Sequence, residues 1–186
     1  MKTIDFRETG QIFDESDRPT PPPPPEWFAA GTILFRKFLM VESMAVYRSN
    51  YPDPQGVQHI LPVDASDAEI GAALLDALDK SRFLTPDQPE FDAFFGDWIE
   101  GRNDDAYDAG LMEVAGVKTR ATLYRGARSV GVRAEGGDQI LLTAWRRRRG
   151  RWFSGDGGGP VETLPRDTSP EALGAAWRRA VALAGD

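Results

Sequence analysis

Short apolar and aromatic runs alternate with polar turns along most of the chain, which is the pattern of a strand-rich fold. Runs of about four to eight residues rich in β-branched and aromatic side chains predict strands. The expected strands span residues 32–38, 42–47, 57–61, 121–124, 129–134, 139–145, 151–153 and 160–164. Turn residues separate them, as at Tyr51–Gly56 and Gly136–Asp138, so we expect a mostly antiparallel sheet.

One helix start is well marked between the third and fourth of these runs. Ser66-Asp67-Ala68-Glu69 forms a capping box, in which the serine hydroxyl accepts from the backbone of Glu69 and the glutamate side chain reaches back. Apolar residues follow at helical spacing: Ile70, Leu74, Ala77 and Leu78. The spacing predicts a helix that runs to about Ser81.

A similar sequence pattern occurs again 103 residues later in the chain. Leu61–Ser66 is matched by Leu164–Ser169, and Gly71–Ala73 is matched by Gly174–Ala176. A serine N-cap followed by Pro170 at the first helical position predicts a second helix. We therefore predict an α+β fold: a mostly antiparallel sheet with helices packed on it, built from two related strand–strand–helix halves. The small residues in each helix favour close backbone packing over phosphate binding.

The expected domain organisation follows from these halves. Residues 1–30 contain the proline run and predict a proline-rich N-terminal arm. Residues 31–186 form one α+β domain, whose halves span about 31–84 and 114–186. They are joined by an acidic helical segment at 85–113, where Phe91, Phe94, Phe95 and Trp98 recur at helical spacing. That spacing predicts an aromatic inner face and a carboxylate outer face.

Charge is concentrated in this connecting segment. The chain carries a net charge of −7, and nine acids between Thr85 and Glu113 face only Arg102, so this segment carries −8 and the remainder +1. A local field of one sign steers a partner of the opposite sign and repels nucleic acid.

Composition removes several kinds of chemistry. There is no cysteine, which excludes disulfides, thiolate metal sites and thiol nucleophiles. The N-terminus has no apolar signal region, and no stretch approaches the roughly 18 apolar residues of a membrane span. We expect a cytoplasmic protein.

No motif nominates a catalytic centre, a cofactor or a metal. The single histidine, His59, lies in a strand without a cysteine or second histidine, and a strand histidine making one hydrogen bond is the preferred interpretation. Asp104, Asp105 and Asp108 match no calcium-loop spacing. The loop Gly155–Gly159 precedes a predicted strand, whereas a phosphate loop opens a helix.

One basic cluster supports an alternative. Arg146–Arg151 holds five arginines, and Trp145 and Trp152 flank it, a combination that can pair with phosphates and stack on bases. A nucleic-acid-binding regulator is therefore the alternative function. A hydrolase that uses a pair of carboxylates and an assembly protein rank below it.

Several stretches, in order, resemble a known family. They are Ile60–Arg82, the acidic Asp97–Glu100, Gly116–Thr119 followed by Leu123-Tyr124, and Leu164–Ala176. Together they are similar to one family of immunity proteins of contact-dependent growth inhibition (CDI), from about Val57 to the C-terminus. The resemblance implies a cytosolic antitoxin, not an enzyme, that binds the C-terminal toxin domain delivered by a neighbouring bacterium. It carries over no catalytic residues.

The acidic segment suggests where such a partner binds. Toxin domains that attack RNA or DNA are commonly basic around the active cleft, because their substrate is a polyanion. We hypothesise that the partner-binding surface consists of Asp92, Asp97, Glu100, Asp104, Asp105 and Asp108, with an ordinary solvated face as the alternative. We expect neither nucleic acid nor membrane as a partner, and the sequence leaves the oligomeric state open.

Overall fold

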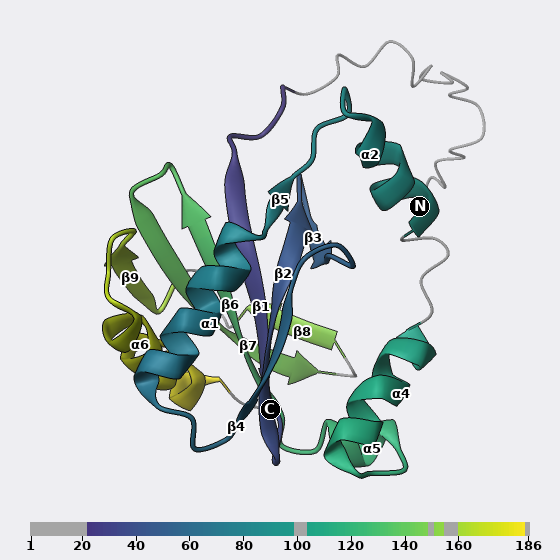
Figure 1. Ribbon diagram of the computed structural model, residues 1–186, viewed down its shortest axis with the longest axis vertical. Helices are drawn as coiled ribbons and strands as arrows, with labels where there is room; N and C mark the ends of the chain where they lie inside the picture. The colour runs from purple at the N-terminus through teal and green to yellow at the C-terminus, as the bar shows by residue number, and fades with distance from the viewer. Residues whose placement is uncertain (1–21, 99–103, 149–150, 155–159, 185–186) are drawn as a thin grey trace, which may run out of the picture.

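A computed structural model describes residues 22–98, 104–148, 151–154 and 160–184 of the chain (Figure 1). In this part, nine strands form one sheet with six of them in the order β3-β2-β1-β6-β7-β8, while β4 and β5 pair with β2 and β9 pairs with β7. Every pairing is antiparallel except the short parallel contact of β5 with β2. The predicted α+β class with a mostly antiparallel sheet is confirmed.

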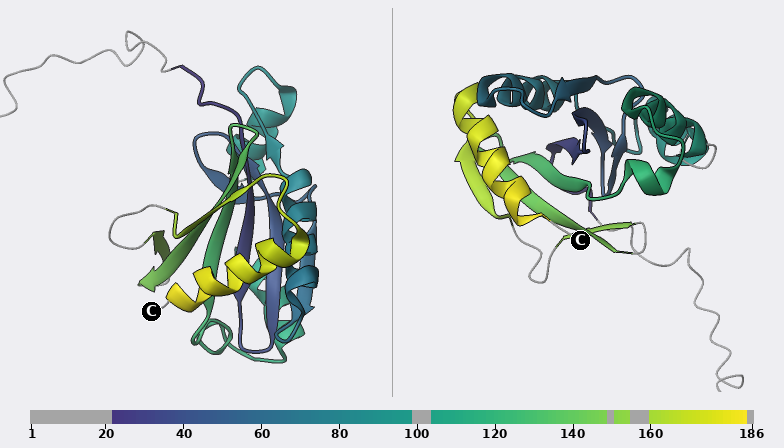
Figure 2. Two further views of the ribbon diagram at one scale, coloured as in Figure 1. Left: turned by 90° about the vertical axis from the view of Figure 1, so that its left-hand side faces the viewer. Right: turned by 90° about the horizontal axis from the view of Figure 1, so that it is seen from below.

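The strands are β1 (Trp27–Leu34), β2 (Phe38–Val46), β3 (Asn50–Pro52), β4 (Gln58–Pro62), β5 (Arg82–Phe83), β6 (Arg128–Glu135), β7 (Gln139–Arg148), β8 (Arg151–Ser154) and β9 (Glu162–Pro165). The helices are α1 (Asp67–Asp79), α2 (Pro89–Phe91), the π-helix η2 (Asp92–Trp98), α4 (Asp104–Ala115), α5 (Arg120–Leu123) and α6 (Pro170–Leu183). Helices α1 and α6 lie together against one face of the sheet, and α4 with α5 lies apart from them (Figure 2).

The first two strands begin earlier than the pattern predicted. The turn between them contains Phe35, whose amide donates to the Phe38 carbonyl over 2.9 Å, although the sequence placed both residues inside one strand. Their rings contact each other in a tilted arrangement with centroids 4.7 Å apart, and both rings are buried although Arg36 and Lys37 between them are exposed. Because β1 begins at Trp27, the expected arm of residues 1–30 overlaps a core strand; residues 1–21 lie outside the described part.

A second difference lies at residues 121–124, which were expected to form a strand; residues 121–123 belong to helix α5 instead, and Tyr124 is its C-cap. Thr119 is the N-cap, and its hydroxyl accepts from the Thr122 amide. A threonine cap outweighs the weak strand tendency of so short a run. Gly136 and Gly137, by contrast, form the predicted hairpin turn with φ of 61° and 80°, values that glycine adopts without strain.

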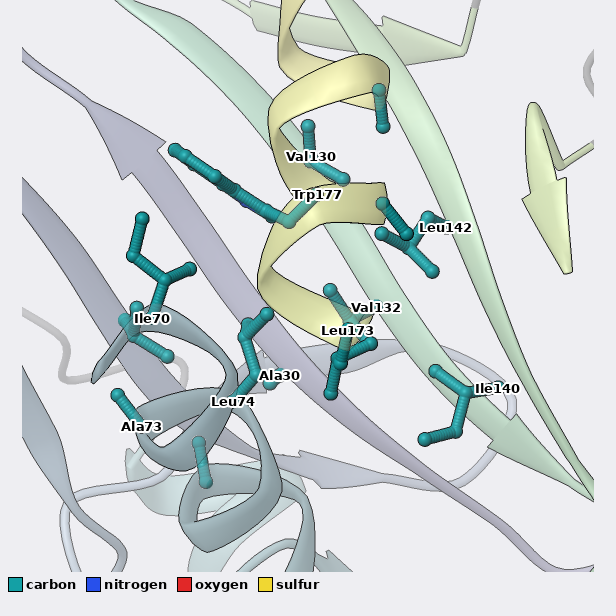
Figure 3. Close-up of a cluster of buried hydrophobic side chains, with 14 of the residues drawn as sticks. Ala30, Ile70, Ala73, Leu74, Val130, Val132, Ile140, Leu142, Leu173 and Trp177 are labelled. Carbon is teal, nitrogen blue, oxygen red and sulfur yellow. The ribbon is translucent and has the colours of Figure 1, made fainter. Parts of the chain in front are cut away.

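The two predicted helices begin as the sequence indicated. Both halves of the Ser66 capping box are present at α1, and Ser169 caps α6 with Pro170 in the first turn. Their apolar faces and the even-numbered residues of β1 and β6 bury one large cluster, which includes Ile70, Leu74, Val130, Val132, Leu142, Leu173 and Trp177 (Figure 3). Trp177 donates its indole N–H to the hydroxyl of the buried Thr32 over 2.9 Å, so the polar atoms in this cluster are paired.

The predicted close packing of the small residues is confirmed at the crossing of α1 and α6. A Cβ added to Gly71 would lie 1.8 Å from the carbonyl oxygen of Pro170, and one added to Gly174 would lie 1.9 Å from that of Asp67. Since Asp67 and Pro170 open the two helices, each glycine packs on the other helix's first turn. The sequence repeat thus corresponds to a symmetrical contact.

Candidate interaction surface

The structure describes the side chains of three of the six predicted partner-binding acids. Asp92 is exposed on η2 and Asp105 on α4, whereas Asp108 is only 2% exposed. Asp97 and Asp104 belong to η2 and α4, but their side chains, like all of Glu100, lie outside the described part. Two of the six are therefore shown on the surface and one is in the interior.

Aromatic side chains hold the first part of the acidic segment. Phe94 is buried with Ala45 and Leu84, as the predicted inner face requires. Phe91 packs edge-on against the ring of Tyr47 at 5.2 Å, and Phe95 lies 4.9 Å from Phe91. This anchoring fixes α2 and η2 beside β2 and β3 and leaves Asp92 toward solvent.

Helices α4 and α5 cover the opposite face of the sheet from α1 and α6. Leu111 and Leu123 are buried against Phe38 and Met40, whereas the neighbouring β2 residues Leu39 and Val41 face the other cluster. The Lys37 ammonium donates to the Ala115 carbonyl over 2.6 Å, which satisfies the C-terminal end of α4. The sheet therefore positions the second half of the acidic segment through the side chains on one face of β2.

Asp108 has a structural task within this helical pair. Its carboxylate accepts from the Tyr124 hydroxyl over 2.6 Å and pairs with Arg120, which also bonds the exposed Asp105 over 3.0 Å. Burial of a carboxylate is tolerated when it is paired and hydrogen-bonded. Asp108 consequently joins α4 to α5 and presents almost no surface to a partner.

Sequence reasoning missed a second buried acid, Glu42, in the middle of β2. The hydroxyl of Tyr107, on α4, donates to the Glu42 carboxylate with oxygen–oxygen distances of 2.8 and 3.0 Å, and the Gln58 amide donates to it over 3.2 Å. The available signal was an isolated acid within an otherwise apolar run, Phe38–Val46. Such a residue needs internal partners, and here they tie α4 to the sheet.

An open groove occupies the part of this face that α4 and α5 leave uncovered. Its volume is about 550 Å³, and its lining includes Trp27, Gly31, Met44, Trp145 and Trp152. Gly31 and Gly131 stand opposite each other in the β1–β6 register. A Cβ on Gly131 would lie 2.5 Å from the Trp145 indole nitrogen, so the glycine lets that ring lie flat across the sheet.

The remaining candidate residues are placed as follows. His59 Nε2 lies 2.8 Å from Asp76 Oδ2, which confirms a strand histidine held by one hydrogen bond. Residues 146–148 and 151 of the arginine cluster lie in β7 and β8, and the glycine loop 155–159 is outside the described part. Among the described residues, no three His, Asp or Glu side chains converge to hold a metal ion. None of the described helices combines the length and apolar character that a membrane crossing requires.

Comparison with known proteins gives one consistent family. The family described as CDI immunity protein matches residues 29–184. The immunity protein CdiI-YPIII of Yersinia pseudotuberculosis is 31% identical over 164 residues, covering 82% of this chain and 92% of the relative.

Two solved structures share the fold over nearly their whole length. A Neisseria meningitidis protein of unknown function superimposes with a TM-score of 0.76 at 27% identity, covering 86% of this chain and 96% of that one. A chain of the CdiA-CT/CdiI toxin and immunity complex from Yersinia pseudotuberculosis gives a TM-score of 0.74 at 28% identity, covering 86% and 98%. The sequence and the fold agree across both halves and the connecting segment, and the chain belongs to the CDI immunity protein family.

Proposed function

We propose that this chain is the antitoxin of a CDI system: it binds the C-terminal toxin domain of a cognate effector and neutralises it. The observation that carries this proposal is the extent of the family match, residues 29–184. That match includes both structural halves and the acidic segment between them. Such coverage supports transfer of the family's role, which a match to an isolated helix would not.

Neutralisation proceeds by binding, without catalysis by this chain, and takes place in the cytoplasm, where a delivered toxin domain acts. One solved relative comes from a complex of a toxin with its immunity protein, which supports direct contact as the mode of action. A stoichiometric inhibitor needs an exposed surface that is rigidly held and complementary to its target.

The proposed contact surface includes the acidic segment, with a nuclease as the expected toxin. The aromatic contacts of Phe94 and the hydrogen bond from Tyr107 to Glu42 hold its two parts against the sheet, so acids displayed there are presented on fixed backbone. We keep Asp92, Asp97, Glu100, Asp104 and Asp105 in this surface and remove Asp108, because its carboxylate is committed internally. Opposite charge accelerates association and penalises wrong partners.

The test is co-expression with the C-terminal domain of the effector encoded beside this chain's gene. We expect growth rescue and co-purification of a complex. A folded chain that neither rescues growth nor binds the domain contradicts the proposal for that partner.

The surface assignment has its own test. Changing the five retained acids to Asn or Gln should slow association and weaken binding by roughly 10-fold or more. A control variant neutralises three exposed acids beside the starts of α1 and α6, Asp64, Asp167 and Glu171, and should leave affinity unchanged. Equal affinity for both sets of variants excludes the acidic segment as the contact.

A further inference from the structure

The two halves of the fold are covered unequally on the face that carries the groove. In the first half, Phe38 and Met40 of β2 are buried beneath α4 and α5. In the second half, Leu141, Thr143 and Trp145 on the same face of β7 are only half-buried. Helices α4 and α5 cover only part of this face, and the groove lies on the uncovered part, which β1, the end of β2 and the second-half strands β6 to β8 share.

The groove combines aromatic walls with positive charge. The Arg133 guanidinium stacks over the Trp27 ring with its carbon 4.0 Å from the centroid, and its Nε pairs with Glu135. Arg48 is exposed at the rim, where it packs on the Tyr47 ring and donates to the Pro22 carbonyl. Among the described residues that line the groove there is no carboxylate.

Strands β7 and β8 supply two further aromatic side chains, Trp145 and Trp152, to the lining. An arginine stacked on an aromatic ring keeps the edge of its guanidinium for in-plane hydrogen bonds, and a carboxylate matches that edge in a bidentate way.

We propose that this groove is a second contact site for the toxin domain and that it receives a loop carrying acidic and apolar side chains. The inference rests on the proposed antitoxin function. An acidic toxin loop complements a groove lined by arginine and tryptophan, whereas the acidic segment contacts basic surface elsewhere on the same partner. Two sites of opposite sign fix the orientation of the partner and reject a toxin that matches only one of them.

A protein loop fits the surroundings better than a nucleic acid does. The acidic segment, which carries −8 between Thr85 and Glu113, packs along the same sheet and disfavours the approach of a long polyanion. A short protein loop places its carboxylate at the arginines without bringing further negative charge near Asp92 or Asp105.

The experiment measures binding of the full chain to the effector's C-terminal domain by titration calorimetry, together with growth rescue. Thr143→Trp fills the groove opposite Gly131, and Arg48→Glu reverses charge at the rim without touching the core. Lys80→Glu is the matched charge reversal, because Lys80 is exposed at the end of α1 on the helical side. Far-ultraviolet circular dichroism checks that each variant is folded.

We expect T143W and R48E each to weaken binding by roughly 30-fold or more, as for a central interface residue. R48Q should weaken binding less than R48E does, and K80E should bind like wild type. If wild type binds and rescues while T143W and R48E do the same, the groove proposal is overturned and the antitoxin function stands. If wild type itself neither binds the toxin domain nor rescues growth, the groove proposal and the antitoxin function are both contradicted for that partner. Binding of a fluorescein-labelled oligouridylate that T143W abolishes, with toxin binding intact, also overturns the proposal and assigns the groove to nucleic acid.

Discussion

Replacing Gly71 by alanine tests whether the contact between α1 and α6 limits the stability of the fold. The added Cβ would lie 1.8 Å from the Pro170 carbonyl oxygen, while ordinary contact begins at 3.4 Å, so the helices must separate by about 1.6 Å in a close-packed interior. The atom that is met belongs to backbone, at a helix start fixed by its Ser169 cap. Rotation of a side chain therefore cannot relieve the clash.

The magnitude follows from two opposing effects. Overpacking of a core costs about 1–3 kcal/mol and sometimes more, and a rigid backbone contact belongs at the upper end. Alanine also gains about 1 kcal/mol over glycine in helix propensity. We expect Gly71→Ala to lower the free energy of unfolding by about 2 kcal/mol or more, which corresponds to a fall in Tm of roughly 4–8 °C for a chain of this size.

Gly174→Ala should behave in the same way, since its Cβ would meet the Asp67 carbonyl oxygen at 1.9 Å. The double variant should cost less than the sum of the two, because helices that have separated for one methyl group already accommodate much of the other. Full additivity would show that the two contacts relax independently and would contradict a shared crossing.

The assay is urea unfolding followed by circular dichroism and tryptophan fluorescence. Gly110→Ala is the matched control: it is exposed on α4, and a Cβ there has no atom within 4 Å, so stability should rise by up to about 1 kcal/mol. A Gly71→Ala protein as stable as wild type would refute the reasoning. Equal destabilisation by the control would refute it as well.

Three further perturbations probe the buried polar groups and the surface charges. Thr32→Val leaves the indole N–H of Trp177 without its acceptor and should cost about 1–3 kcal/mol in urea unfolding, whereas Thr32→Ser, which keeps the hydroxyl, should cost less. Asp108→Ala should lower the free energy of unfolding by about 1–3 kcal/mol in the same measurement. Asp105→Ala should change it by no more than about 0.5 kcal/mol, because the Asp105 side chain is 86% exposed. A larger loss of stability in Asp105→Ala than in Asp108→Ala would contradict the assignment of Asp108 as the buried acid. The pKa of Glu162 is lowered by its hydrogen bond to Arg179 of α6. The stabilisation from this ion pair is therefore complete above the ordinary pKa of 4.5 and disappears as the pH falls through the lowered pKa. The stability difference between wild type and Glu162→Gln should shrink over that pH range, and a difference independent of pH would exclude the ion pair as its source.

The sequence by itself determined helices α1 and α6 and the relationship between them. The Ser66 capping box and the Ser169-Pro170 start depend on side chains within one turn of the helix they begin, so local sequence suffices to place them. The repeated Gly-Ala-Ala predicted close packing, since only small side chains permit a near approach of backbones. Alternating apolar residues likewise gave most of the strands and the antiparallel class.

Tertiary structure decided the features that depend on distant partners. Residues 32–38 were predicted as one strand, but a turn after Leu34 separates β1 from β2, and the burial of Phe35 and Phe38 against α4 and α5 stabilises that turn. Asp108 appeared to be one more surface acid, and only the approach of Tyr124 and Arg120 places it inside. The groove depends on how much of the sheet face α4 and α5 cover. Spacing along the chain predicts which side chains share a face, whereas packing between elements decides whether that face is buried or open to a partner.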